Sequence, residues 1–126
     1  MAQPPRPPGP TAREQARKRA LLAQLEQLGW YCRGSLLHVM NRCGTPGCRC
    51  KADPPELHGP YWQWTRKVEG KTVTRRLSDA EAQRLRRWLA NAKRLDRIVA
   101  ELDALSDAVT NRMLAAAAAA RKTPVS

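Results

Sequence analysis

The chain has few of the residues that fill the cores of small proteins. Its 126 residues include no Phe and four Trp, and hydrophobic residues make up 42%. A single small domain with so little apolar area commonly needs a metal, disulfides or a partner chain to fold stably. We therefore expect one small core that is reinforced by something besides apolar packing.

Long hydrophobic runs are absent too. No stretch approaches the roughly 20 consecutive apolar residues that span a bilayer, and the N-terminus lacks the basic start and apolar run of a signal peptide. We therefore expect a cytoplasmic protein with no membrane partner. In that reducing compartment, three cysteines within eight residues indicate metal ligands rather than disulfides.

Motifs of catalysis are missing as well. A zinc deaminase requires His-x-Glu and Cys-x-x-Cys, and the sequence has neither, nor does it have a glycine-rich phosphate loop. No single thiol among the cysteines is distinguished by a base and an orienting partner, as a nucleophile would be. We therefore expect a protein that is not an enzyme.

Acidic residues are scarce relative to basic ones. The chain has 23 Lys and Arg against 11 Asp and Glu, which gives a formal net charge of +12. A basic surface kept for solubility, an acidic protein partner or a membrane surface would each account for this excess. Nucleic acid is the commonest reason for it in a small cytosolic domain, and we expect a nucleic-acid partner.

The segment CGTPGCRC is the most informative feature that is present. Four residues rich in turn formers separate Cys43 from Cys48, Cys50 follows after one residue, and His58 comes eight residues later. Three Cys and one His can close a tetrahedron around zinc, with Zn–S distances near about 2.3 Å and no open position for a substrate. We therefore predict a structural Zn²⁺ site at Cys43, Cys48, Cys50 and His58.

Other interpretations of these residues stay open. Paired cysteines with two-residue gaps are the commoner zinc signature. Cys32, eleven residues upstream of Cys43, is a rival to His58 as the fourth ligand, although a small buried hydrophobic side chain is the simpler interpretation. The cluster could also be a metal-free loop of reduced thiols.

The first ten residues carry five prolines, which remove backbone donors and block helix formation. We expect a disordered tail over residues 1–11. Thr11 can cap the helix that follows, which is predicted from Ala12 to about Leu28 and ends at Gly29. One apolar stripe along this helix is formed by Leu21, Leu22, Leu25 and Leu28.

A strand and a hairpin are predicted next. The short apolar run over residues 35–40 indicates a buried strand, and residues 61–68 and 71–77 flank a tight turn at residues 69–70. Pairing residue 68 with 71 places 62 opposite 77. One face then carries apolar side chains with basic ones at its margin, namely Trp62, Trp64, Val68, Val73, Leu77, Arg66, Lys71 and Arg75.

A long helix is predicted towards the C-terminus. Ser78 and Glu81 form a capping box, a specific signal for a helix start. Apolar positions then recur in alternating steps of three and four residues, as in a coiled coil, and six alanines at 115–120 extend the helix. The stripe comprises Leu85, Trp88, Ala92, Leu95, Val99, Leu102, Ser106, Val109 and Met113, widened by Leu89, Ile98 and Leu105.

This stripe can pack on the sheet, on the first helix or on a second copy of the chain. Because its second half extends past anything a small sheet could cover, we expect a homodimer through the C-terminal helix. The predicted fold class is α+β: an N-terminal helix, a small antiparallel sheet with a zinc knuckle, and the long helix. The predicted organisation is a domain over residues 12–100, a coiled-coil extension over 101–121 and a disordered tail over 122–126.

Basic residues concentrate on the hairpin and on the start of the long helix. Residues 66–97 hold eleven basic and four acidic residues, which is more than half of the net charge. A two-stranded ribbon can enter a major groove, where most contacts go to phosphates, so we expect salt-dependent DNA binding with weak sequence preference. The candidate nucleic-acid-binding residues are Arg66, Lys67, Lys71, Arg75, Arg76, Arg84, Arg87 and Arg94. RNA is an alternative if Tyr61 and its neighbouring tryptophans are exposed for stacking.

Three segments, CGTPGCRC, LHGPYW and EGKTVTRRL, follow a recognisable pattern. With the Gly-Ser-Leu at residues 34–36, they resemble a small prokaryotic domain family of uncharacterised function over roughly residues 34–100. The resemblance implies the metal site and no catalytic residue. Genes of this kind look like those found near mobile elements, which implies an accessory DNA-binding role.

These observations favour a zinc-stabilised, basic DNA-binding protein of the cytoplasm, associated with the nucleoid. We expect it to serve as an accessory subunit of a recombination, transposition or defence complex. The alternative is an adaptor that docks through its coiled coil on a larger assembly while its charge meets an acidic partner.

Overall fold

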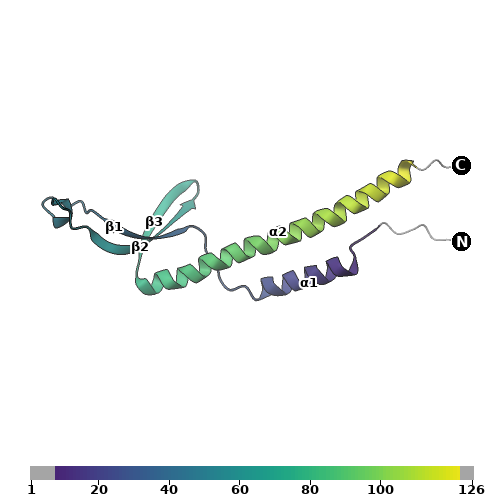
Figure 1. Ribbon diagram of the computed structural model, residues 1–126, viewed down its shortest axis with the longest axis horizontal. Coiled ribbons are helices and arrows are strands. Elements are labelled where there is room, and N and C mark those ends of the chain that lie inside the picture. Colours follow the sequence, from purple (N-terminus) through teal and green to yellow (C-terminus); the bar gives the residue numbers. More distant parts are fainter. Residues whose placement is uncertain (1–7, 123–126) are drawn as a thin grey trace. The chain divides into compact units, whose positions relative to one another are not determined.

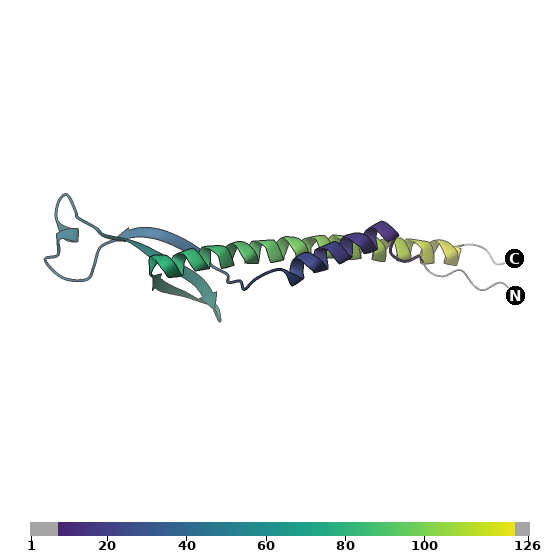
Figure 2. The ribbon, with the colours of Figure 1, turned by 90° about the horizontal axis from the view of Figure 1, so that it is seen from below.

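The computed structural model describes residues 8–122 and has an α+β fold (Figure 1 and Figure 2). This confirms the predicted helix, small antiparallel sheet and long C-terminal helix. Of the two predicted tails, residues 1–7 and 123–126 lie outside the described residues. The elements are α1 (Ala12–Glu26), β1 (Ser35–Asn41), the 3-10 helix η1 (Arg49–Lys51), β2 (His58–Val68), β3 (Lys71–Leu77) and α2 (Asp79–Lys122).

The chain divides into two compact units. One covers Gly29–Lys93, and the other combines the chain up to Leu28 with the chain from Arg94 onward. The sheet therefore belongs to the first of these, which we call the sheet unit. The helix α1 belongs to the other, the helical unit, and α2 contributes to both.

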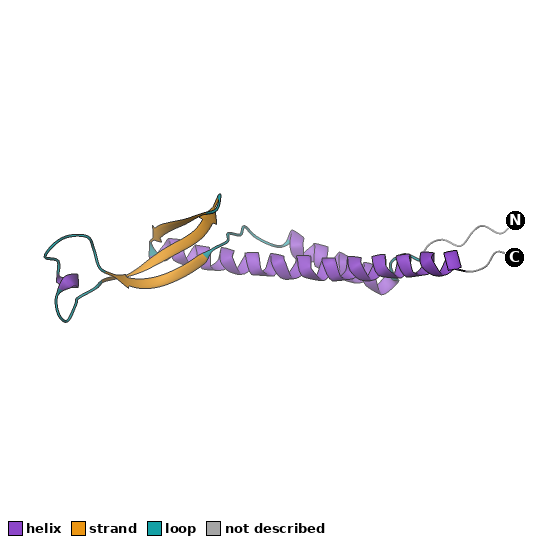
Figure 3. Cartoon of the chain, turned by 90° about the horizontal axis from the view of Figure 1, so that it is seen from above, coloured by secondary structure: helices purple, strands orange, loops and turns teal. Residues whose placement is uncertain are grey.

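The three strands of the sheet unit form one antiparallel sheet in the order β1-β2-β3 (Figure 3). The β1–β2 pairing runs from Ser35 opposite Thr65 to Asn41 opposite His58, with an irregularity just before Asn41. Because β1 continues to Asn41, β2 begins at His58, three residues before the predicted start of the hairpin.

The hairpin of β2 and β3 has the predicted register. Val68 pairs with Lys71 and Trp62 with Leu77. The two turn residues, Glu69 and Gly70, have φ angles of 50° and 80°. Two-residue hairpin turns of this kind require positive φ at both positions, because their backbone twist then matches that of the strands.

Side chains alternate between two faces of the sheet. One face, the helix face, carries Trp62, Trp64 and Leu77, and Leu77 is only 7% exposed. The Arg86 guanidinium of α2 lies 5.2 Å from the centre of the Trp62 ring, so the first turns of α2 contact this face. The other face, which we call the open face, has exposed side chains along β3 and carries Leu37, Val39, Tyr61, Gln63, Thr65, Lys67, Thr72, Thr74 and Arg76.

The start of α2 is capped as predicted. The Ser78 N–H donates to Glu81 Oε1 (2.9 Å), and the Glu81 N–H donates to Ser78 Oγ (3.2 Å). About two turns after Glu81, the segment before β1 is bound to this helix, because the Cys32 N–H donates to the Trp88 carbonyl (3.3 Å). These bonds connect the sheet to α2 from both ends of the strand series.

In the helical unit, α1 lies along the second half of α2 (Figure 2). Leu21 of α1 is 1% exposed and Ile98 of α2 is 2% exposed. The helix α1 ends at Glu26, two residues before the predicted end, because the Leu28 N–H donates to the Leu25 carbonyl (3.1 Å) in a tighter final turn.

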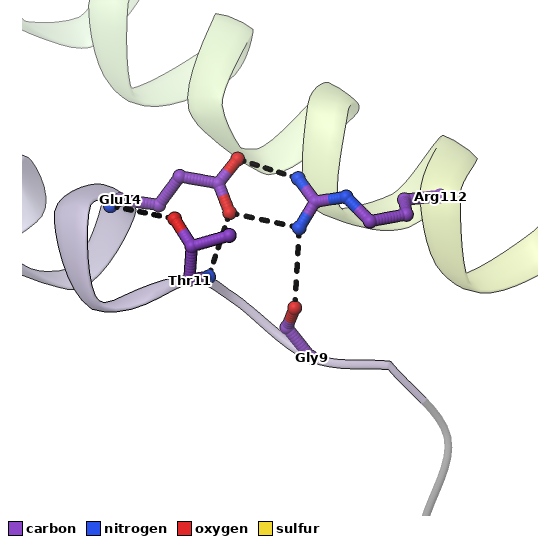
Figure 4. A network of polar contacts seen from close by, with 4 residues as sticks. All are labelled: Gly9, Thr11, Glu14 and Arg112. Carbon is purple, nitrogen blue, oxygen red and sulfur yellow. Dashed lines mark hydrogen bonds and ion pairs between the residues drawn. The ribbon is translucent and has the colours of Figure 1, made fainter.

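A polar network fixes the start of α1 (Figure 4). Thr11 caps the helix as predicted, and Glu14 completes a capping box by accepting from the Thr11 N–H (2.8 Å). Both carboxylate oxygens of Glu14 also accept from the Arg112 guanidinium of α2, at 3.0 and 2.7 Å. The Arg112 ion pair and the cap hydrogen bonds from Thr11 lower the pKa of Glu14 to about 2.

Candidate metal centre and basic sheet

The four predicted ligands lie in and around the loop between β1 and β2. Cys43 and Cys48 precede η1, Cys50 lies within it, and His58 is the first residue of β2. A hydrogen bond from the Cys48 N–H to the Thr45 carbonyl (3.4 Å) closes the turn between the first two cysteines. The turn formers therefore bring both thiols to the same end of the loop.

The side chains of these four residues converge. Their ligand atoms all lie within 4.8 Å of one another. Cys43 Sγ is 3.6 Å from Cys50 Sγ, and Cys48 Sγ is 3.0 Å from His58 Nε2. Cys50 is fully buried, whereas the other three are half-buried. The cluster is thus closed on its inner side and could hold a metal ion.

The distances fit a tetrahedral ion. Four sulfur ligands about 2.3 Å from a central zinc would be about 3.8 Å apart, and Cys43 and Cys50 already approach that separation. A bound ion would replace the hydrogen bond between Cys48 and His58 and widen that pair slightly. Three sulfurs and one imidazole are soft and borderline donors, which suit zinc better than calcium or magnesium.

The thiols of Cys43 and Cys48, at the two ends of the turn, have lowered pKa values. Hydrogen bonds from the Thr45 backbone and from Cys48 lower the pKa of Cys43 to about 6. The backbone N–H of Cys50, together with His58, lowers the pKa of Cys48. Thiolate is the form that binds metal, so these hydrogen bonds favour the ligand state of both residues.

The pKa values of the other two predicted ligands, Cys50 and His58, are raised. The Cys43 N–H donates to Cys50 Sγ (3.3 Å) and lowers its pKa, but burial and the thiols of Cys43 and Cys48 raise the pKa of Cys50 overall. The hydrogen bond with Cys48, and a further one with Cys43, raise the pKa of His58. Metal binding would therefore release protons from this half of the cluster.

A glycine fixes the direction in which His58 enters the site. Gly59 has a φ of 115°, and a Cβ atom there would lie 2.8 Å from the Val39 carbonyl oxygen. Only glycine adopts this conformation readily. The close approach of β1 to β2 at this point therefore depends on a residue without a side chain directly after the histidine.

Cys32 lies outside the cluster. Its Sγ is 4.0 Å from the Leu85 carbonyl on α2, and burial raises the pKa of its thiol. The group of four that converges contains His58 and not Cys32. Cys32 is thus not a rival for the fourth ligand position in this structure.

All eight predicted nucleic-acid-binding residues are exposed, but they do not share one surface. Lys67 and Arg76 lie on the open face of the sheet, whereas strand alternation puts Arg66, Lys71 and Arg75 on the helix face. The others lie on α2, where Arg94 falls in the helical unit and Arg84 and Arg87 in the sheet unit.

The three strands contain no acidic residue. They carry Arg66, Lys67, Lys71, Arg75 and Arg76. The sheet unit as a whole has 13 Lys and Arg against five Asp and Glu, so it carries a net +8 of the chain's +12. Positive charge is therefore concentrated on the unit that holds the cysteine cluster.

A hollow of about 240 Å³ lies between the cluster and the open face. Its lining includes Arg42 from the loop and Tyr61, Gln63 and Arg76 from the sheet, together with Asn41, Cys43 and His58. The Arg76 guanidinium lies 3.7 Å from the centre of the Tyr61 ring. An arginine stacked in this way keeps its N–H donors in a fixed plane, which suits recognition of a phosphate or carboxylate.

Sequence reasoning missed Arg42, Asn41 and Gln63 as part of a site. Arg42 is adjacent to Cys43, and Gln63 lies two residues after Tyr61, on the same face of β2. Their positions in the sequence therefore indicated a shared site only weakly, and the pairing of β1 with β2 is what brings them together. Trp62 and Trp64 are half-buried on the helix face and do not join this hollow.

The fold and the cluster define a small α+β protein with three cysteines and one histidine gathered at one end of its sheet. The chain belongs to the family described as a domain of unknown function (DUF6788), which matches residues 11–87. This confirms the expected membership of an uncharacterised small domain family. No curated protein and no solved structure matches the chain. Among the described residues, no helix is both long and apolar enough to cross a membrane.

Proposed function

We propose that the protein binds Zn²⁺ through Cys43, Cys48, Cys50 and His58, and that it binds DNA through the basic sheet beside this site. The zinc would act as a structural ion that ties the loop between β1 and β2 to the sheet. A closed set of four protein ligands leaves no position for a substrate, which agrees with a binding protein rather than an enzyme.

The observation that carries the DNA-binding proposal is the complete absence of acidic residues from three strands that hold five Lys and Arg. An ordinary solvated surface mixes charges of both signs. Positive charge without intervening acidic groups attracts a polyanion, whose counterions are released on binding.

The hollow beside the cluster supports the same proposal at the level of single groups. Arg76, held over Tyr61, and Arg42 line a space without an acidic side chain, and the amides of Asn41 and Gln63 add hydrogen-bond donors. A backbone phosphate is the group that this donor set fits best. Lys67 lies on the same face and would contact a neighbouring phosphate.

An accessory role in a recombination, transposition or defence assembly belongs to this proposal, because a small binding module without catalytic motifs needs a partner to act on DNA. An adaptor role is the alternative. It requires the basic sheet to contact an acidic protein instead of nucleic acid.

Titration of labelled duplex DNA at several salt concentrations tests the proposal. The logarithm of the wild-type binding constant should fall linearly with the logarithm of the salt concentration, and a double variant with Lys67→Glu and Arg76→Glu should reduce the slope by about two. Arg13→Glu, a single charge reversal on the exposed surface of α1, is the control and should leave the slope unchanged. Zinc content of each variant verifies that the loop is intact.

Two results would argue against this function. No binding of any duplex by micromolar protein at low salt would exclude DNA as a partner. If the double variant with Lys67→Glu and Arg76→Glu binds duplex DNA normally but fails to assemble with a protein partner, the adaptor role is correct. Single-stranded RNA in the same titration serves as a competitor, and tighter binding of RNA would change the partner class.

A further inference from the structure

The two helices of the helical unit leave an apolar groove between them. The groove has a volume of about 630 Å³, and Leu22 of α1 lines it together with Leu105 and Val109 of α2. Lys18 and Arg19 lie along its α1 side. Leu22 is 43% exposed although it belongs to the apolar stripe of α1, so part of that stripe has no cover within the helical unit.

The apolar stripe of α2 is wider than α1 can cover. Apart from alanines, the apolar positions of α2 after Leu95 that are buried or half-buried are Ile98, Leu102, Leu105 and Val109. A second series, spaced by seven residues, consists of Val99, Ser106 and Met113, and all three are exposed, with Val99 at 43%. Two packed helices bury one stripe each, whereas a bundle buries a broader one. The exposed series and the groove lie together, because Ser106 belongs to both.

Two ion pairs fix the register of the helices. Arg17 pairs with Glu101 (2.6 Å), and Glu14 pairs with Arg112 (2.7 Å), so α1 and α2 run antiparallel. Averaged over the two ion pairs, this register sets Arg19 at about the level of Asp103, which is exposed on α2. The groove thus has Lys18 and Arg19 at its α1 edge, and Asp103 lies at about that level on α2, outside the groove lining.

We propose that a second copy of the chain occupies this groove, so that two α1–α2 pairs form an antiparallel four-helix bundle. A two-fold axis parallel to the helices places α2 of one copy beside α1 of the other. Heights are preserved by such a rotation, so Arg19 of one copy meets the partner's Asp103. The same contact occurs twice, as an isologous interface requires. Charge complementarity of the edges and the uncovered apolar series identify the occupant as a second copy.

The molar mass of the zinc-loaded full chain in solution tests this proposal. Sedimentation or light scattering should give twice the 14.1 kDa mass of one chain. Leu22→Glu places a charge in the groove and should convert the dimer to a monomer. Leu114→Glu is the matched control, because Leu114 is 53% exposed and does not line the groove, and it should leave the dimer intact.

A charge exchange provides a second measurement that does not depend on a core substitution. Arg19→Asp and Asp103→Arg, made singly, should each weaken the dimer, and the two together in one chain should restore it. A monomeric wild-type protein at high micromolar concentration overturns the proposal, even if it assembles with a different protein. A dimer that resists Leu22→Glu but dissociates with Leu114→Glu overturns the assignment of the groove.

Discussion

Each of the four ligand residues is held by a different local interaction. A turn positions Cys48, the 3-10 helix η1 holds the buried Cys50, a backbone N–H to sulfur bond links Cys43 to Cys50, and β2 carries His58. Ligands on separate supports can adjust individually to an ion. Substitution of one ligand residue should therefore weaken metal binding without unfolding the local structure that holds the other three.

Substitution of a single ligand tests this arrangement. Cys43→Ser should lower zinc affinity by more than about 100-fold, the upper end of the effect of changing a residue that only supports a ligand. Cys32→Ser is the matched control and should retain one zinc per chain, because that thiol lies against Leu85 instead. Metal analysis of the reduced proteins is the measurement. Equal zinc content in both variants would contradict the assignment.

A second prediction at this scale concerns Gly34, which precedes β1. Its φ is 121°, and a Cβ atom there would lie 2.5 Å from the Thr65 carbonyl oxygen. Gly34→Ala should destabilise the protein by more than about 1 kcal/mol, since both the backbone conformation and the space oppose a side chain. In Gly44→Ala, a Cβ atom meets nothing within 4 Å, and its thermal midpoint should stay close to that of the wild-type protein. Similar thermal midpoints for Gly34→Ala and Gly44→Ala would contradict the predicted destabilisation by Gly34→Ala.

At the scale of elements, the ion pair between α1 and α2 makes stability depend on pH. The pKa of Glu14 is about 2 in the folded protein and about 4.5 in the unfolded chain. A lowered folded pKa stabilises the protein above the unfolded value, and this contribution is lost as the pH falls from 4.5 towards 2.

The measurement is the thermal midpoint of the wild-type protein and of Glu14→Gln across this range. At neutral pH the wild-type midpoint should be the higher, and the difference should shrink steadily as the pH falls to about 2. Arg13→Gln, which removes a charge one residue earlier, is the control. A constant difference at every pH would mean that the carboxylate charge contributes nothing.

Much of the element pattern could be predicted from the sequence. The capping box at Ser78 and the alternation on both sides of residues 69–70 rest on local chemistry, and both the helix start and the hairpin register are confirmed. The start of β2 at His58 could not be predicted, because Gly59 and Pro60 resemble a loop and only pairing with β1 makes them part of a strand.

The long helix shows a different limit. The heptad pattern predicted one stripe over the whole of α2, and in its first half Ala92 is buried and Leu85 and Trp88 are half-buried, as expected. Beyond Leu95, however, the buried series passes through Ile98 and Leu105, which the pattern treated as additions, and leaves Val99 exposed. Both series are apolar, so the sequence could not decide between them. The choice depends on where α1 packs.

The candidate site, too, could be predicted from the sequence only in part. Cys43, Cys48, Cys50 and His58 were predictable because ligand type and spacing are a local code. The separation of the basic residues between two faces was not, and neither was the stacking of Arg76 on Tyr61, which are far apart in sequence. Such contacts arise only when β2 and β3 pair.

At the scale of the whole molecule, an ion bound at the proposed site should stabilise one unit and not the other. All four ligands belong to the sheet unit, whereas the helical unit depends on Leu21, Ile98 and its ion pairs. Removal of the metal with a chelator should lower the thermal midpoint of the sheet and leave most helical circular dichroism in place. Calorimetry should then resolve two transitions. A single transition that the chelator does not shift would contradict a structural ion.

The ligands of the cluster all lie between Cys43 and His58, on one short stretch of chain. Closing so short a loop costs little entropy, because the cost rises with the number of residues enclosed. During synthesis this stretch leaves the ribosome before α2 does. An ion captured there would give the nascent chain its first fixed point, against which β3 and the long helix are added in order.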